Sequence, residues 1–170
     1  LEKYKKWKAI VIGDERRELM KFYHKNLNLM GFQTHNTVLK ILKKTSIAVA
    51  CSRWNEPLGR TSLEASSNGC AVIISNRGGL PETITNGIIL KKLDESELFK
   101  EIEFLIKNNS IRKKYQKLSN KNFIHTNIKS SNEVDNYRDI LLGNYNLNLK
   151  TKKTINSLRI LHVTNFNERH

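Results

Sequence analysis

The fold is decided by residues 47–75, IAVACSRWNEPLGRTSLEASSNGCAVIIS. Two short apolar runs bound this stretch, Ile47–Ala50 at its start and Ala71–Ser75 at its end. Apolar runs of this length are typical of strands that are buried on both faces of a sheet. Between them, residues 59–68 have the pattern of a helix, and Gly69 is a natural stop for it. The stretch therefore predicts two buried strands joined by a helix.

The same alternation continues on both sides of this stretch. Upstream, residues 8–12 and 27–32 are predicted strands, and residues 15–26 and 35–44 are predicted helices. Downstream, Pro81 suits the first turn of a short helix, residues 88–90 form a further strand, and residues 94–142 are helical with breaks near 108–109 and 126–127. Because the strands are apolar throughout, we expect an α/β, Rossmann-like fold with a parallel sheet and helices on both faces. Such sheets bind ligands at the carboxyl ends of their strands.

Composition excludes several classes of protein. Hydrophobic residues make up 38% of the 170 residues, which is enough for a packed core and too many for a disordered chain. No apolar run approaches the length of about 18 residues that marks a transmembrane helix, and the first residues lack the pattern of a secretory leader. The formal net charge of +14 has two interpretations, a Lys- and Asn-rich genome composition or contact with a membrane surface or nucleic acid.

The cysteines and histidines predict no metal site. Cys51 and Cys70 have neither the spacing of zinc ligands nor that of a disulfide framework, which fits a reducing compartment. The five histidines are scattered along the chain, and none has a second plausible ligand at a metal-binding spacing. We therefore expect a cytoplasmic protein without a metal.

The pattern changes after residue 143. Residues 1–143 are predicted to form one domain, and residues 144–157 are polar and basic without a helical stripe, as in a linker. Residues 158–170 begin with an apolar run that resembles the first strand of a following domain. The alternative for this run is a tail or an edge strand of the first domain. The chain begins with Leu1 rather than Met, and we expect it to be a piece of a longer protein.

Two carboxylates make residues 56–64 the candidate site. Glu56 lies in the loop after the strand 47–50, and Glu64 lies eight positions further on, within the following helix. The N-terminus of that helix offers free backbone N–H groups and a partial positive charge, which suit a phosphate. Carboxylates beside it are suited to accept hydrogen bonds from sugar hydroxyls. The spacing alone leaves a second interpretation open, in which both carboxylates are solvated helix charges.

The order of several short segments is more specific than this spacing, and together they resemble one family. The segments are Ser52-Arg53-Trp54-Asn55-Glu56-Pro57-Leu58-Gly59-Arg60, Leu63-Glu64-Ala65, Asn68-Gly69-Cys70-Ala71-Val72-Ile73 and Gly78-Gly79-Leu80-Pro81-Glu82. They resemble the C-terminal, nucleotide-sugar-binding half of retaining glycosyltransferases of the GT-B fold, group 1 or family 4. The resemblance extends over about residues 8–142. Leu58 stands where the family usually has Phe, and Ala71 where it often has Pro.

The resemblance implies a role for each residue of the candidate site. Glu64 matches the carboxylate that binds the ribose hydroxyls, and Glu56 matches the one beside the donor sugar, which makes it the candidate catalytic residue. The backbone of Leu58, Gly59 and Arg60 matches the helix start that faces the sugar and the diphosphate.

Two further segments complete the implied pocket. Gly31 and Phe32 match the segment that lines the nucleobase. Gly79, with Gly78, matches an element that shapes the donor pocket, and the alternative for these two residues is a plain tight turn. In the family, a Gly-Arg segment and a Lys clamp the diphosphate, and we expect that segment to precede Leu1. Arg16, Arg17 and Lys21 are interpreted as solvated helix charges rather than as substitutes for it.

The implied activity is transfer of a hexose from a nucleoside-diphosphate sugar, such as a UDP- or GDP-sugar, with retention of configuration and without a cofactor. The implied partners are an acceptor glycan or lipid-linked sugar, an N-terminal acceptor domain and, through the basic surface, the inner face of a membrane. The piece alone is then expected to be inactive. The alternative is a non-catalytic, Rossmann-like nucleotide-binding or interaction module. A nucleic-acid partner is not expected, because aromatic residues are not interleaved with the lysine clusters.

Overall fold

The strand β4, Ala71–Ser75, lies at the centre of a three-stranded sheet, and all five of its residues are buried. It pairs in parallel with β3, Ile47–Ala50, on one side and with β5, Gly87–Leu90, on the other. The register places Ile74 between Ala50 and Ile89. The apolar runs of the sequence therefore form parallel strands as predicted, with the most apolar run in the middle.

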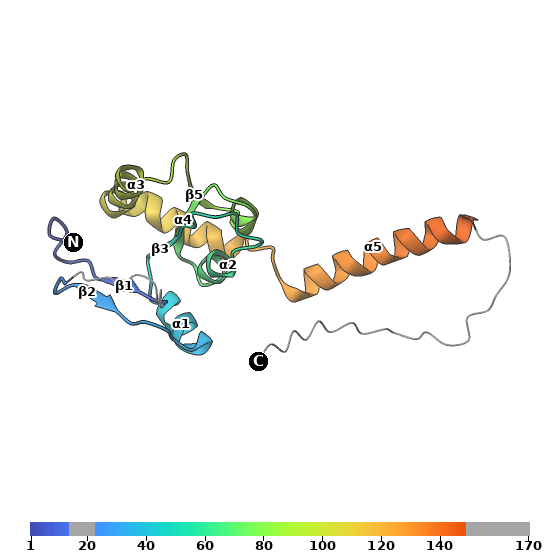
Figure 1. Cartoon of the computed structure of the whole chain (residues 1–170), viewed down its shortest axis with the longest axis horizontal. Helices are drawn as coiled ribbons and strands as arrows, with labels where there is room; N and C mark the ends of the chain where they lie inside the picture. Colours follow the sequence, from blue (N-terminus) through green and yellow to red (C-terminus); the bar gives the residue numbers. More distant parts are fainter. Residues whose placement is uncertain (14–22, 149–170) are drawn as a thin grey trace. The chain divides into compact units, whose positions relative to one another are not determined.

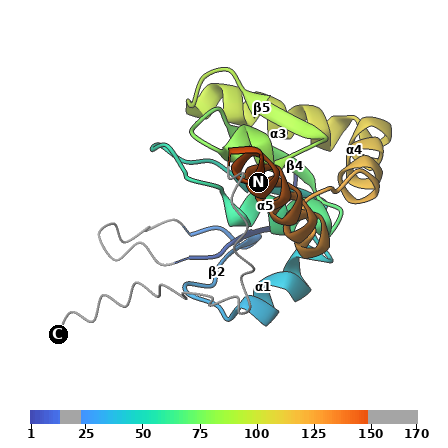
Figure 2. The same ribbon diagram turned by 90° about the vertical axis from the view of Figure 1, so that its right-hand side faces the viewer.

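Helices pack against both faces of this sheet (Figures 1 and 2). Val72 and Ile74 pack in a core with residues of α1, His35–Leu42, of α2, Arg60–Ser67, and of the short 3₁₀ helix η1, Leu80–Thr83. Ala71 and Ile73 point to the other face, where they pack with residues of α3, Glu95–Lys107, and α4, Asn109–Lys121. Side chains of a strand alternate between faces, so β4 contributes to both cores. The predicted α/β, Rossmann-like fold class is confirmed.

The structure is a computed structural model, and it describes residues 1–13 and 23–148. It divides into two compact units, Leu1–Thr126 and Asn127–His170. The described part of the second unit is one helix, α5, Asn127–Asn148. Residues 144–148, the start of the predicted linker, are therefore helical. The predicted strand at 158–165 lies outside the described residues, as do most of the predicted helix 15–26 and the side chains of Arg16, Arg17 and Lys21.

The strands form two parallel sheets where the sequence predicts one. Strands β1, Ala9–Val11, and β2, Leu27–Leu29, pair in parallel with each other, and the order of the other sheet is β3-β4-β5. The pairing of β1 with β2 is extended by a hydrogen bond from the Gly13 N–H to the Gly31 carbonyl, 2.9 Å long. Within the described residues, β1 and β3 are not paired with each other. Chain order predicts the direction of the strands, but it does not determine which strands are neighbours.

The N-terminal segment is held on α3 and α4 by polar contacts. The Lys3 Nζ and the Tyr4 hydroxyl both donate to Glu103 Oε1, at 2.5 Å and 2.6 Å. Lys107 Nζ lies 3.1 Å from the other oxygen of the same carboxylate. The guanidinium of Arg112 lies over the ring of Trp7, 5.0 Å from its centre, as in a cation–π contact. Together, Lys3, Tyr4 and Lys107 hold the pKa of the Glu103 carboxyl at about 2, well below its usual range.

This cluster predicts a specific response to acid. Because the pKa of Glu103 is lowered in the folded chain, its contribution to stability is complete above the unfolded value of about 4.3 and is lost as the pH falls toward 2. The urea midpoints of the wild-type chain and the Glu103→Gln variant should therefore differ by a constant amount above pH 5 and converge between pH 4 and pH 2. Glu101→Gln, on the same helix, is the control. A difference between wild type and Glu103→Gln that does not change with pH would contradict the assignment.

Within residues 1–13 and 23–148, no helix is both long and apolar enough to cross a membrane. In the same part of the chain, no group of three or more His, Cys, Asp and Glu side chains is arranged to hold a metal ion.

Candidate functional site

A cavity of about 570 Å³ lies at the carboxyl end of β3, where a parallel sheet is expected to bind its ligand. Its walls come from the end of β3, from the loop that follows and from the first turn of α2. The lining residues are Val49, Ala50, Cys51, Ser52, Glu56, Pro57, Leu58, Gly59, Arg60, Thr61 and Leu80. Four residues of the candidate site, Glu56, Leu58, Gly59 and Arg60, are thus brought together around one cavity.

The helix α2 presents its N-terminus to this cavity. Gly59 precedes the helix with a φ of +79°, a left-handed conformation that favours glycine, and a Cβ at this position would overlap the side chain of Leu80. Within the described residues, no side chain caps this end of the helix, so its first N–H groups remain available to an anion. The turn at Gly59 is fixed by contacts with the first turns of α2 and with η1. The Ser62 hydroxyl donates to the Gly59 carbonyl at 2.6 Å and lies 2.5 Å from the Thr83 hydroxyl.

Glu56 is a half-buried residue that lines the cavity. The indole N–H of Trp54 donates to Glu56 Oε1 at 2.7 Å, and this fixes one of its two oxygens. The backbone of Glu56 is held by the turn that contains Gly78 and Gly79. The Gly79 N–H donates to the Glu56 carbonyl at 2.7 Å, and a Cβ on Gly78 would lie 2.7 Å from the Glu56 nitrogen. Gly79 does not line the cavity; it supports the loop that does.

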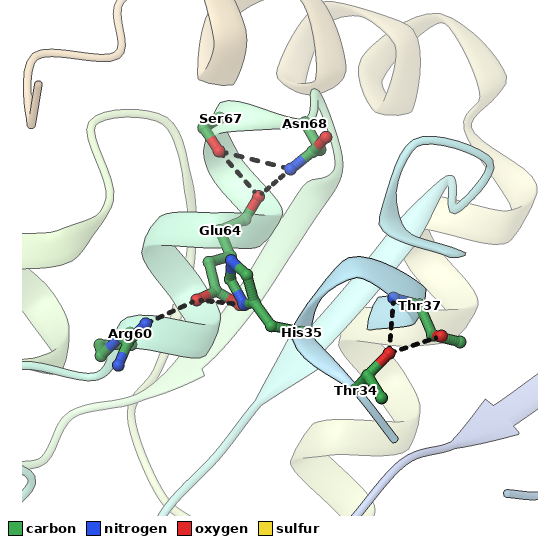
Figure 3. A network of polar contacts seen from close by, with 7 residues as sticks. All are labelled: Thr34, His35, Thr37, Arg60, Glu64, Ser67 and Asn68. Carbon is green, nitrogen blue, oxygen red and sulfur yellow. Dashed lines mark hydrogen bonds and ion pairs between the residues drawn. The ribbon is translucent and has the colours of Figure 1, made fainter. Parts of the chain in front are cut away.

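Glu64 lies apart from the cavity, on the side of α2 that faces α1 (Figure 3). Its side chain is 21% exposed. His35 Nδ1 lies 3.6 Å from Glu64 Oε1, and the Arg60 guanidinium lies 3.7 Å from the same oxygen. Glu56 therefore lines the cavity and Glu64 does not, but Arg60, which also lines the cavity, pairs with Glu64.

Gly31 and Phe32 lie in the loop between β2 and α1, and neither lines the cavity. The Gly31 carbonyl accepts the hydrogen bond from Gly13, so this loop is fixed to the end of β1. The Phe32 side chain is 81% exposed and available for contact with a ligand. Because the loop leads directly into the first turn of α1, it is connected to Glu64 through His35.

The sequence analysis assigned no role at the site to four polar residues that lie near it, Cys51, Ser52, Ser75 and His35. The Ser52 N–H donates to Ser75 Oγ at 2.8 Å, and Ser75 Oγ donates to the Ser52 carbonyl at 3.0 Å, which joins the ends of β3 and β4 beside the cavity. Burial raises the pKa of the neighbouring Cys51 thiol. His35 was missed because its contact with Glu64 depends on how α1 packs on α2, and no pattern in the sequence records that packing.

Parallel strands, a cavity at a strand end and a free helix N-terminus define a Rossmann-like ligand-binding domain. Within this class, the family model for glycosyl transferases group 1 matches residues 1–123, and the chain belongs to this family. The resemblance predicted from the sequence is confirmed.

Two curated relatives are similar to this chain, and one of them is named as a glycosyltransferase. The chain is 32% identical to spore coat protein SA of Bacillus subtilis (strain 168) over 112 residues, which are 57% of the chain and 30% of the relative. It is 30% identical to the uncharacterized glycosyltransferase MJ1069 of Methanocaldococcus jannaschii over 135 residues, which are 75% of the chain and 34% of the relative. The chain thus spans about a third of the length of these relatives.

Solved structures share the fold. A glycosyltransferase from Rickettsia africae ESF-5 is similar with a TM-score of 0.64 at 20% identity, over 79% of this chain and 40% of that one. Anabaena Alr3699/HepE, in its complex with UDP-glucose, is similar with a TM-score of 0.59 at 20% identity, over 73% of this chain and 39% of that one.

Proposed function

We propose that this chain is the donor-binding part of a glycosyltransferase that moves a sugar from a nucleoside diphosphate to an acceptor with retention of configuration. The observation that carries the proposal is the cavity at the end of β3, bounded by Glu56 and the N-terminus of α2, in a chain of the group 1 family. The chain spans a third of its relatives, so the acceptor is assigned to a part of the protein beyond this domain.

The residues of the cavity suit a diphosphate and the sugar attached to it. The free N–H groups at the start of α2 and the cationic side chain of Arg60 favour the negative charge that builds up on the leaving diphosphate. Stabilising that charge and positioning the donor are the main contributions that such a transfer needs from the protein. Glu56, with one oxygen held by Trp54, has its other oxygen available for a hydroxyl of the donor sugar.

The nucleoside is assigned to the side of α2 that faces α1. Glu64 accepts hydrogen bonds from the ribose hydroxyls there, and the exposed Phe32 contacts the base. The structure of Anabaena Alr3699/HepE with UDP-glucose makes UDP the first nucleotide to test. GDP is the second nucleotide to test, and comparison of the two affinities indicates which base the natural donor carries.

Glu64→Ala is the variant that tests this assignment. Removal of the carboxylate leaves the ribose hydroxyls without their acceptor, and we expect a loss of about 1–3 kcal/mol of binding free energy. Isothermal titration calorimetry of the full chain with UDP and with GDP measures it. Glu101→Ala, which removes a carboxylate from α3, is the control. Equal affinity of Glu64→Ala and wild type for whichever nucleotide binds would refute the assignment.

The alternative is a binding module of the same fold without activity. An assay for sugar transfer by the full-length gene product distinguishes the enzyme from the binding module, with Glu56→Gln as the variant. An enzyme would lose most of its transfer rate in Glu56→Gln while still binding nucleotide. NMR of the product determines its anomeric configuration, and an inverted configuration would overturn the proposal of retention. Nucleotide binding without any sugar transfer would favour the non-catalytic binding module.

A further inference from the structure

His35 and Glu64 meet although 28 residues and the strand β3 separate them in the chain. His35 is the first residue of α1, and Glu64 lies in the middle of α2. Figure 3 shows the imidazole turned toward the carboxylate, with Arg60 reaching it from the opposite side. The cluster is therefore a contact between two helices as well as an ion pair.

Both basic side chains contact the same oxygen of the carboxylate. His35 Nδ1 lies 3.6 Å and the Arg60 guanidinium 3.7 Å from Glu64 Oε1, and neither of these ion pairs uses Oε2. The carboxylate is 21% exposed, whereas the His35 and Arg60 side chains are 55% and 78% exposed. The two ion pairs favour an orientation in which Oε1 faces both cations, and among the described residues Oε2 is then the oxygen that a ligand can use.

The first turn of α1, which carries His35, is held by its N-cap. Thr34 precedes α1 as its N-cap, and Thr34 Oγ1 accepts a hydrogen bond from the Thr37 N–H at 3.4 Å and lies 2.9 Å from the Thr37 hydroxyl. On the other helix, the Glu64 carbonyl accepts from Ser67 Oγ at 3.0 Å and from Asn68 Nδ2 at 2.8 Å. The ends of both elements are thus fixed around the pair (Figure 3).

We propose that His35 is a positioning residue for nucleotide binding: its contact with Glu64 Oε1 presents Oε2 to a pair of vicinal hydroxyls such as those of ribose. The proposal rests on the proposed function, because Glu64 must be the group that binds the nucleoside. It also assigns a second effect to His35. The contact joins α2 to the helix that begins directly after the Gly31–Phe32 loop, so the base-contacting and ribose-contacting segments move as one.

The experiment compares His35→Gln, Glu64→Gln and the double variant with the wild-type full chain by calorimetry with UDP and GDP. The control is Asn36→Ala, an exposed neighbour in the same helical turn. We expect His35→Gln to weaken binding about two- to fivefold. In the Glu64→Gln background it should have no further effect, because a positioning residue acts only through the carboxylate that it positions.

The outcomes separate this inference from the proposed function. If neither nucleotide binds the wild type, or if Glu64→Gln binds as well as wild type, the assignment of Glu64 fails and the role of His35 fails with it. If Glu64→Gln weakens binding while His35→Gln behaves as Asn36→Ala does, the role of His35 is overturned and the proposed function stands. A loss in His35→Gln that persists in the Glu64→Gln background would also overturn it, because His35 would then act without Glu64.

Discussion

Gly79→Ala is expected to lower the free energy of unfolding by about 2–3 kcal/mol, with loss of nucleotide binding in the same variant. The backbone at Gly79 has a right-handed conformation that alanine adopts without strain, so the expected cost comes from overlap alone. A Cβ at this position would collide with the Pro57 carbonyl oxygen, and backbone atoms cannot move aside as a flexible side chain can. The loop that carries Glu56 and Pro57 must therefore shift, and the wall of the cavity shifts with it.

Gly78→Ala should be more costly still, because two penalties add. Its φ of +53° disfavours any residue with a Cβ, and that Cβ would also overlap the backbone of Asn55 and Glu56. Urea unfolding measures both variants. The control is Gly143→Ala, in a helix where a Cβ would have no atom within 4 Å, and it should leave stability unchanged or raise it slightly. If Gly79→Ala is as stable as wild type, the turn is a plain tight turn and does not shape the pocket.

The parts of the site that are local in sequence could be predicted, and the parts that depend on packing could not. Glu56, Leu58, Gly59 and Arg60 belong to one loop and one helix start, so a strand end followed by a helix is enough to place them at a cavity. The side of α2 on which Glu64 lies depends on how α2 is rotated against its neighbours. That rotation is set by Ala65 and Ser62, which are buried, and it turns Glu64 toward α1.

In the fold, too, local features could be predicted from the sequence, and features that depend on the pairing of distant segments could not. Apolar runs such as Ala71–Ser75 predict buried strands, because a strand covered on both faces has few positions for polar residues. The separation into two sheets depends on which strands share hydrogen bonds, and hydrophobicity does not record that. The helix α5 continues to Asn148, beyond the predicted start of the linker. Once a helix has formed, each further residue adds a hydrogen bond, and this outweighs the weak helix propensity of asparagine.

Ile74→Ala is expected to lower the free energy of unfolding by about 2–5 kcal/mol, the cost of a large-to-small change at a fully buried position. Ile74 lies in the core between β4 and the helices α1 and α2, together with Val72 and Leu42. The structure there is built around a strand with neighbours on both sides, so the surroundings have little freedom to close the space that the missing atoms leave. Urea unfolding followed by circular dichroism measures the loss.

Ile89→Ala is the matched control, because Ile89 lies directly opposite Ile74 in the register of β4 and β5. Side chains of paired residues point to the same face of a sheet, so the two isoleucines differ mainly in the helices that cover them. Ile89 is 43% exposed on the outer strand of this sheet, and its change to alanine should cost less than about 1.5 kcal/mol. Equal losses would mean that the helical layer also covers β5. A small loss in Ile74→Ala would mean that α1 and α2 do not pack on β4 as described, and the contact between His35 and Glu64 would lose its structural basis.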